Sequence, residues 1–291
     1  MTPCKLVLVE GIPGPGKTTT ATFVKRLLDR HDVPSRLFCE GDLDHPADFE
    51  SVAHFDGPDF EAFLANHAPY RHLLEQHAVT EGADHFLPYR KLRGDYEGVP
   101  LDDLVAELAR RDVYETPLAS TYCRLATARW QHFVAEAHRR QEVTVLETCF
   151  LQNPLTVLLG KHNVPVSDAL DHIHTIAKVV QPLQPVLVYL QQRHPRATLE
   201  RAGAERPQAW KEFLITYFTQ QGWGKATGAQ GFEGVIAFYE MRQRVELQVI
   251  HSADLDYLIV DTDARSWDEN QRVLAAFLGS VLDLTTSPST N

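Results

Sequence analysis

A short motif near the beginning of the chain combines glycines with a lysine and a threonine at a fixed spacing. From Gly11 to Thr18 the sequence reads Gly-Ile-Pro-Gly-Pro-Gly-Lys-Thr, directly after the largely apolar segment 5–10 and directly before a helix-like segment. Glycines at this spacing let successive backbone N–H groups turn toward one point and form an anion-binding nest. The helix adds the positive end of its dipole. The pattern and its context therefore predict a loop that binds the phosphates of a nucleoside triphosphate.

Two side chains of this loop have expected tasks in such a site. Lys17 would reach the β- and γ-phosphates, and the Thr18 hydroxyl would ligate Mg²⁺. The expected cofactors are accordingly ATP, or another NTP, and Mg²⁺. The other loop residues expected to hold the nucleotide are Gly11, Pro13, Gly14, Pro15, Gly16 and Thr19.

Carboxylates follow two further apolar segments. Glu147 ends one of them, where an acid can hold Mg²⁺ or its water shell beside the phosphate loop, or can simply cap the next turn. Glu40, Asp42 and Asp44 follow the segment 35–39 in one short loop. A hydroxyl that accepts a phosphoryl group needs a base, and mutual repulsion would raise one of these pKa values toward the useful range. Asp42 is the preferred base and Glu40 a substrate-binding residue, with an ordinary solvated acidic loop as the alternative.

Arginines and an asparagine extend this set. Arg201 and Arg206 follow the apolar segment 185–190, and guanidinium groups carried by a mobile lid can neutralise charge on a transferring phosphoryl group. A solvated arginine-rich turn is the alternative. Asn153 and Arg90 are expected to contact the phosphoryl acceptor, and Asn153 equally suits a simple turn.

Short apolar segments alternate with longer helix-like segments. This alternation predicts an α/β fold in which helices cover both faces of a parallel sheet of about five strands. Ligands of such sheets bind at the carboxyl ends of the strands, where several of the residues named above are found. Strands are expected at 5–9, 35–39, 143–147, 185–190 and 257–260. Helices are expected at 17–30, 100–111, 118–140, 166–180, 196–201, 207–220, 232–251 and 267–278.

The expected domain organisation is simple. Residues 1–284 would form a single domain, followed by a flexible polar tail at 285–291. Two stretches are too long for plain connections. The first, about 41–117, is interpreted as a mostly helical substrate-binding insertion. The second, the glycine-rich stretch 222–234, is interpreted as a mobile loop within a lid at about 193–234.

Composition argues against several classes of protein. The 291 residues are 44% hydrophobic, which suits a packed core, and the formal net charge is −11 with no basic stretch to offset it. This charge argues against a nucleic-acid partner. No apolar run approaches the roughly twenty residues of a membrane helix, and no secretory signal precedes the first strand, so a cytoplasmic protein without a membrane partner is expected. The four cysteines form no C-x-x-C pair and are interpreted as reduced thiols.

Four segments of the chain together resemble the thymidylate kinase branch of the P-loop nucleoside and nucleotide kinases, and bacterial thymidylate kinase-like proteins in particular. In order along the chain they read VEGIPGPGKTTTA, LATARWQHF, VTVLETCF and VLVYLQQRHPRATLERAGAERP. The resemblance implies the three-layer sandwich of P-loop NTPases. It also implies an arginine-bearing lid with Arg201 and Arg206, a substrate-facing Arg129, and Glu147 as the acidic Mg²⁺ residue.

The chain departs from this family at one position that matters. Thymidylate kinases have Asp-Arg at the end of the third strand and deoxynucleoside kinases have Glu-Arg, whereas this chain has Glu147 and Thr148. The acidic loop after Glu40 is more similar to relatives that phosphorylate a hydroxyl with the help of a carboxylate base. We therefore expect a transferase, an ATP- and Mg²⁺-dependent kinase of a small molecule, with a hydroxyl acceptor slightly preferred. A nucleoside monophosphate kinase and an NTP-driven regulatory ATPase with a protein partner are the alternatives, and a homodimer is left open.

Overall fold

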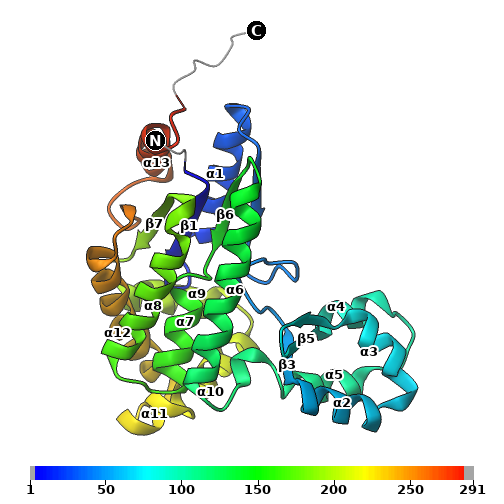
Figure 1. Ribbon diagram of the computed structural model, residues 1–291. Coiled ribbons are helices and arrows are strands. Elements are labelled where there is room, and N and C mark those ends of the chain that lie inside the picture. Colours follow the sequence, from blue (N-terminus) through cyan, green and yellow to red (C-terminus); the bar gives the residue numbers. More distant parts are fainter. Residues whose placement is uncertain (1–3, 285–291) are drawn as a thin grey trace. The chain divides into compact units, whose positions relative to one another are not determined.

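The computed structural model describes residues 4–284 (Figure 1). The tail at 285–291, for which the sequence predicts flexibility, lies outside the described residues. The chain divides into two compact units, Met1–Glu40 with Thr127–Asn291, and Gly41–Ala126. We call them the first and the second unit and describe each by itself.

A five-stranded parallel sheet forms the centre of the first unit, so the predicted α/β class and the five predicted strands are confirmed. The strands lie in the order β2-β6-β1-β7-β8. In β1 every residue is buried, as expected for a strand covered on both faces. The strands are β1 (Leu6–Gly11), β2 (Ser35–Phe38), β6 (Val143–Glu147), β7 (Pro185–Gln191) and β8 (Asp256–Asp261).

Helices α1 (Lys17–Arg30) and α13 (Trp267–Val281) cover one face of this sheet. Their apolar residues pack into one core with Val7 and Val9 of β1 and with the valines of β6 and β7. Successive side chains of a strand point to opposite faces, so Glu10 of β1 lies on the other face. Helix α1 begins directly after the glycine-rich loop, and α13 begins with a complete capping box.

Helix α12 (Gly231–Ser252) packs against the opposite face. The register places Tyr189 of β7 beside Glu10 of β1, and the Tyr189 hydroxyl donates a hydrogen bond to Glu246 of α12 over 2.5 Å. Helices therefore cover both faces, which is compatible with a three-layer sandwich. The remaining helical elements of this unit are α7 (Gln152–Leu155), the π-helical turn η3 (Thr156–Lys161), α8 (Val166–Val180), η4 (Gln181–Leu183), α9 (Pro195–Glu205), α10 (Gln208–Thr219) and α11 (Gly222–Thr227).

The prediction of a mobile loop at 222–234 is wrong. This stretch forms α11 and the beginning of α12. Its glycines permit close packing: a Cβ atom at Gly222 would lie 2.3 Å from the carbonyl oxygen of Lys161, and one at Gly224 would lie 2.3 Å from that of Phe218. Glycine content alone does not separate this use from flexibility.

The second unit combines helices with a three-stranded antiparallel sheet in the order β3-β5-β4. The sequence predicts a mostly helical insertion and names no strand here, because the strands are short and carry histidines and acids in place of a continuous apolar run. The strands are β3 (Val52–Asp56), β4 (Val79–Glu81) and β5 (Asp84–Pro88). The helical elements are α2 (Gly57–Asn66), η1 (Ala68–Tyr70), α3 (Arg71–His77), α4 (Tyr89–Asp95), α5 (Asp102–Ala109) and η2 (Val113–Glu115).

Helix α6 (Ala119–Arg139) begins in the second unit and ends in the first. Within the second unit its Arg124 forms two hydrogen bonds with Asp84 of β5, over 2.6 and 2.9 Å. This pairing extends the second unit beyond residue 117, the limit that the sequence suggests for the insertion.

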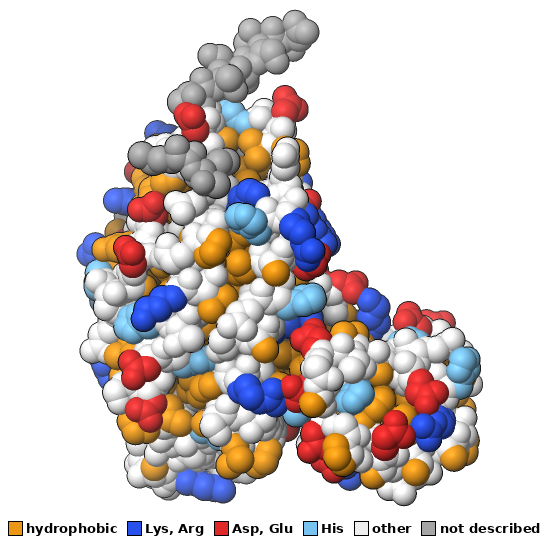
Figure 2. Space-filling model, in the orientation of Figure 1, with side chains coloured by type: hydrophobic (Ala, Val, Ile, Leu, Met, Phe, Trp, Pro, Cys, Tyr) orange, Lys and Arg blue, Asp and Glu red, His pale blue; other side chains and the backbone are white. Residues whose placement is uncertain are grey.

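On the face drawn in Figure 2, Lys and Arg side chains are interspersed with Asp and Glu in both units. Among residues 4–284, no helix has the length and apolar character needed to cross a membrane.

Candidate functional site

The glycine-rich loop connects β1 to α1 at a topological switch point of the sheet. The chain leaves β1 toward β2 on one side and leaves β7 toward β8 on the other, and ligands of open α/β sheets bind at such points. Gly16 occupies the N-cap of α1 in the left-handed region, with φ of 91°, and no side chain caps the helix. The first N–H groups of α1 thus keep their capacity to bind an anion.

Lys17 is buried inside this loop, with 6% of its surface exposed. Its Nζ donates a hydrogen bond to the carbonyl oxygen of Ile12 over 3.1 Å. Burial lowers the pKa of Lys17, against the opposing influence of Glu40 and Glu147. An anion at the loop would stabilise the charged ammonium form, so the buried amine is poised to bind one.

Thr18 and Glu147 are joined across neighbouring strand ends. The Thr18 hydroxyl donates to Glu147 Oε1 over 2.8 Å, and the backbone N–H of Glu40 lies 3.4 Å from Glu147 Oε2. Glu147 itself is 2% exposed. The structure therefore brings together three residues that the sequence places in the site, because the carboxyl ends of β1, β2 and β6 share one edge.

Thr18 and Glu147 have the oxygen atoms that Mg²⁺ prefers as ligands. Mg²⁺ is commonly held by one or two protein oxygens together with phosphate oxygens and water. Thr18 and Glu147 fit that requirement at the first turn of α1. In the described part of the chain, no cluster of three or more His, Cys, Asp or Glu side chains is arranged to hold a metal on its own.

Glu10 fixes the turn that follows Glu147. Its carboxylate accepts the N–H of Phe150 over 2.7 Å and the N–H of Gln152 over 3.0 Å, and it is fully buried. Burial raises its pKa to about 7, against the effect of these backbone hydrogen bonds. Within the same turn Thr148 has a φ of 68°. Sequence reasoning missed Glu10, although an acid at the end of a buried strand is a visible signal.

Gln152 connects this turn to Glu40. Its Nε2 donates to Glu40 Oε1 over 3.1 Å. Its Oε1 is buried and accepts no hydrogen bond from the residues that the structure describes. An unpaired buried acceptor costs about 1–3 kcal/mol, so this atom is a point where a ligand could contribute. The next residue, Asn153, donates its backbone N–H to the Thr148 carbonyl at the beginning of α7.

Helix α12 contributes a buried ion pair on the Glu10 side of the sheet. Arg242 Nε lies 2.9 Å from Glu246 Oε1, and both side chains are fully buried. Arg242 Nη1 also donates to the Thr156 hydroxyl over 2.7 Å, and the guanidinium lies 4.7 Å from the ring centre of Tyr239. Arg242 contributes to the lowered pKa of Lys17. The sequence gives no signal for this role, since Arg and Glu four residues apart also suit an exposed helix.

The predicted lid arginines lie on or next to α9. Arg201 is exposed on this helix, and Arg206 is its exposed C-cap, with its guanidinium 4.8 Å from the ring centre of Trp210. Helix α9 packs on the glycine-rich loop, because a Cβ atom at Gly14 would lie 2.9 Å from Thr198 Cγ2. Arg201 follows Thr198 by three residues and therefore lies near the packed side of α9.

Three further predicted residues lie elsewhere in the chain. Asp42 and Arg90 belong to the second unit, where Asp42 Oδ1 accepts the Asp44 N–H over 2.9 Å and Arg90 pairs with Glu50 over 3.1 Å. Arg129 is half-buried on α6, in the part that belongs to the first unit.

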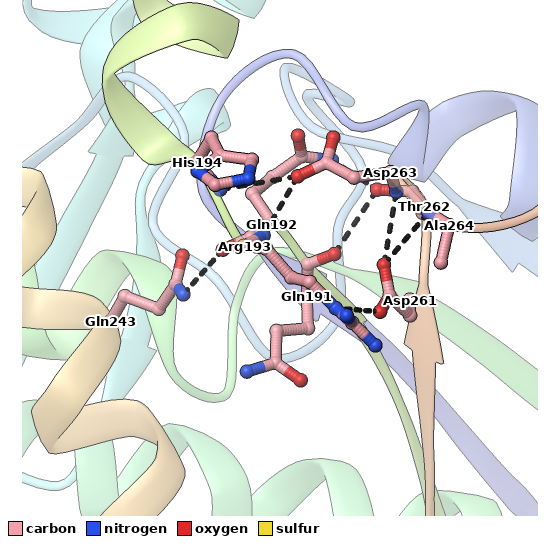
Figure 3. Close-up of polar contacts among 9 residues, drawn as sticks. All are labelled: Gln191, Gln192, Arg193, His194, Gln243, Asp261, Thr262, Asp263 and Ala264. Atoms are coloured by element: carbon pink, nitrogen blue, oxygen red, sulfur yellow. Dashed lines mark hydrogen bonds and ion pairs between the residues drawn. The ribbon is translucent and has the colours of Figure 1, made fainter.

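A polar network that sequence reasoning missed joins the ends of β7 and β8 (Figure 3). Gln243 of α12 donates to the Gln192 carbonyl over 2.7 Å, and the Gln192 amide pairs with Thr198 and Thr262. In the loop after β8, Asp263 accepts the N–H of Arg193 over 2.8 Å. This network ties α9, and so the packing partner of Gly14, to both strand ends.

Comparison with protein-family models and with curated proteins adds no relative. Neither a protein-family model nor a curated protein matches the chain. Function is therefore inferred from the residues of the site and their geometry.

Proposed function

We propose that the protein is a P-loop kinase that transfers the γ-phosphoryl group of ATP, with Mg²⁺, to a hydroxyl group of a small molecule. The observation that carries the proposal is the juxtaposition of Lys17, Thr18 and Glu147 at the uncapped beginning of α1. A buried amine, a metal-binding hydroxyl and a carboxylate at one helix N-terminus are the parts that phosphoryl transfer uses for positioning and charge neutralisation.

Each part has a task in the proposed site. The free N–H groups of the loop and of α1 bind the phosphate oxygens. Lys17 exchanges its hydrogen bond with the Ile12 carbonyl for one with a phosphate oxygen, where its positive charge is better stabilised. Thr18 and Glu147 hold Mg²⁺, directly or through its water shell. Arg201 and Arg206, as lid arginines, neutralise charge on the transferring group.

The proposed reaction needs a base. The acceptor hydroxyl loses its proton to a carboxylate, its oxygen forms the new bond to the γ-phosphorus, and the bond from the γ-phosphorus to the bridging oxygen breaks to leave ADP. Glu40 is the acid of the β2 loop that the structure joins to Glu147 and Gln152, which favours it over our sequence-based choice of Asp42. Asp42, two residues later, stays the alternative base.

ATP binding and turnover test the proposal. The substitution Lys17→Ala should raise the Kd for ATP–Mg²⁺ at least about tenfold, which corresponds to a loss of about 1.4 kcal/mol of binding free energy. It should also abolish ADP formation with a panel of small alcohols and nucleosides. Lys25→Ala, at a half-buried position on the same helix where the side chain pairs with Asp29, serves as the control. Unchanged binding by calorimetry in the Lys17 variant would contradict the nucleotide site.

The choice of base needs a second comparison. If Glu40 is the base, Glu40→Gln should abolish transfer to a hydroxyl while ATP binding persists, and Asp42→Asn should retain most of the activity. The reverse result would restore Asp42. Transfer to nucleoside monophosphates that neither substitution reduces would indicate a nucleotide kinase, since an ionised phosphate needs no base. ATP hydrolysis that depends on a protein partner would indicate a regulatory ATPase.

A further inference from the structure

We propose that Gln152 selects the phosphoryl acceptor by accepting a hydrogen bond from it next to Glu40. The acceptor would then be a neutral or cationic molecule with two neighbouring hydrogen-bond donors, such as a diol or an amino alcohol. This inference rests on the proposed kinase function and names the chemical class of its substrate.

A hydrogen bond to its backbone fixes the position from which the Gln152 side chain extends. The residue opens α7, directly after the turn that leads from Glu147. Its N–H is bound by the fully buried carboxylate of Glu10 over 3.0 Å. The side chain therefore leaves the strand edge at a defined place, on the same turn as the proposed metal residue.

Hydrogen-bond chemistry fixes the orientation of the amide. Its nitrogen lies 3.1 Å from Glu40 Oε1. An ionised carboxylate only accepts hydrogen bonds, so the amide nitrogen must face Glu40 and the amide oxygen must face away from it. Gln152 is 7% exposed, and its Oε1 accepts no hydrogen bond from residues 4–284. The structure thus holds a buried acceptor without a donor.

Two acceptors consequently lie next to each other at the carboxyl edge of the sheet. One is the Glu40 carboxylate. The other is the Gln152 amide oxygen, which belongs to the same amide group whose nitrogen donates to Glu40. Glu147 adds a further carboxylate that is linked to the Glu40 backbone. A molecule with two donors complements this arrangement. An anionic acceptor would meet repulsion from both carboxylates.

The two donors have different fates in the proposed reaction. One is the reacting hydroxyl, which gives its proton to Glu40 as its oxygen attacks the γ-phosphorus and ADP leaves. The other stays intact and donates to Gln152 Oε1, so that it orients the acceptor. A site built around such a hydrogen bond discriminates strongly against an analogue that lacks the donor.

Matched acceptors and isosteric variants test this role. ADP formation is measured with ATP–Mg²⁺ and pairs of acceptors in which one member lacks the second donor: ribonucleosides with their 2′-deoxy analogues, and amino alcohols with their N,N,N-trimethyl analogues. We expect wild type to prefer the two-donor member at least tenfold in kcat/KM. Gln152→Met should abolish that preference, and Gln152→Glu should shift it toward the cationic amino alcohols. Gln141→Met, at an exposed position just before β6 begins, should behave as wild type.

Thermal stability supplies a readout that needs no acceptor. Gln152→Met removes an unpaired buried oxygen together with one hydrogen bond to the exposed Glu40 carboxylate, so its Tm should change little relative to that of Glu40→Ala, which removes the same hydrogen bond. A Tm clearly below that of Glu40→Ala, or a preference that survives in Gln152→Met, would overturn the inference while the kinase proposal stands. ATP binding that depends on Lys17 without ADP formation from any member of the panel would overturn both the hydroxyl-kinase proposal and the inference.

Discussion

Buried charge is the main feature of the site at the scale of single residues. Glu10, Lys17, Glu147, Arg242 and Glu246 are each at most 6% exposed. Burying a charge without full compensation is expensive, and buried ion pairs are weak contributors to stability. We infer that these residues are retained for what they hold in place, the loop and the turn after β6, and for the field they create around Lys17.

The raised pKa of Glu10 leads to a pH-dependent prediction. Its pKa rises from 4.5 in the unfolded chain to about 7 in the fold, so the folded state binds the proton more tightly. Ionising Glu10 therefore destabilises the fold as pH rises from about 5 to 7, by on the order of 3 kcal/mol at about 1.4 kcal/mol per pKa unit. Glu10→Gln should remove this dependence, as measured by urea unfolding across that range.

A control separates Glu10 from the rest of the molecule. Glu212→Gln, at an exposed position on α10, should keep the pH dependence of wild type. An unfolding free energy that changes equally with pH in wild type and in Glu10→Gln would show that other groups cause the dependence.

At the scale of elements, the docking of α9 on the glycine-rich loop is the contact that links the proposed lid to the proposed nucleotide site. Gly14 has a φ of 101° and leaves no room for a side chain beside Thr198. The Thr198 hydroxyl in turn pairs with the Gln192 amide at the end of β7. The position of Arg201, one turn along α9, thus depends on a small interface that a single methyl group can disturb.

Gly14→Ala should destabilise the protein for two separable reasons. The left-handed backbone costs on the order of 1 kcal/mol for alanine, and the new Cβ clashes with Thr198 Cγ2. Thr198→Ser removes that methyl group and keeps the hydroxyl. We expect Gly14→Ala with Thr198→Ser to recover part of the stability that Gly14→Ala loses, as measured by chemical unfolding. Strict additivity of the two changes would contradict this contact.

At the scale of the whole molecule, the chain is built from two units with separate sheets and separate cores. The second unit is a continuous insertion, Gly41–Ala126, with an apolar core of its own that includes Phe55, Leu64 and Leu104. Every contact of the proposed nucleotide site described above belongs to the first unit. Ligand binding should therefore stabilise the two units unequally.

Hydrogen exchange with and without ATP–Mg²⁺ tests this expectation. At about 100 times its Kd, a ligand stabilises the structure that binds it by about 2.7 kcal/mol. Amides of β1 and β6 should therefore exchange more slowly with nucleotide, whereas those of β3 and β5 should change little. At the same ATP–Mg²⁺ concentration, Lys17→Ala should reduce the protection, because its Kd is higher. Equal protection of both sheets would show that the units unfold together.

The sequence by itself determined the five strands and the longer helices of the first unit, and one edge of the site. Compact apolar runs marked all five strands, and parallel strands bring their carboxyl ends together, so Thr18 and Glu147 were expected to meet. Tertiary structure alone decided which neighbours Glu10 and Gln152 have, because their partners lie more than a hundred residues away. It also decided that Gly222, Gly224 and Gly234 serve close packing within helices, since sequence spacing carries no record of the surfaces against which helices pack.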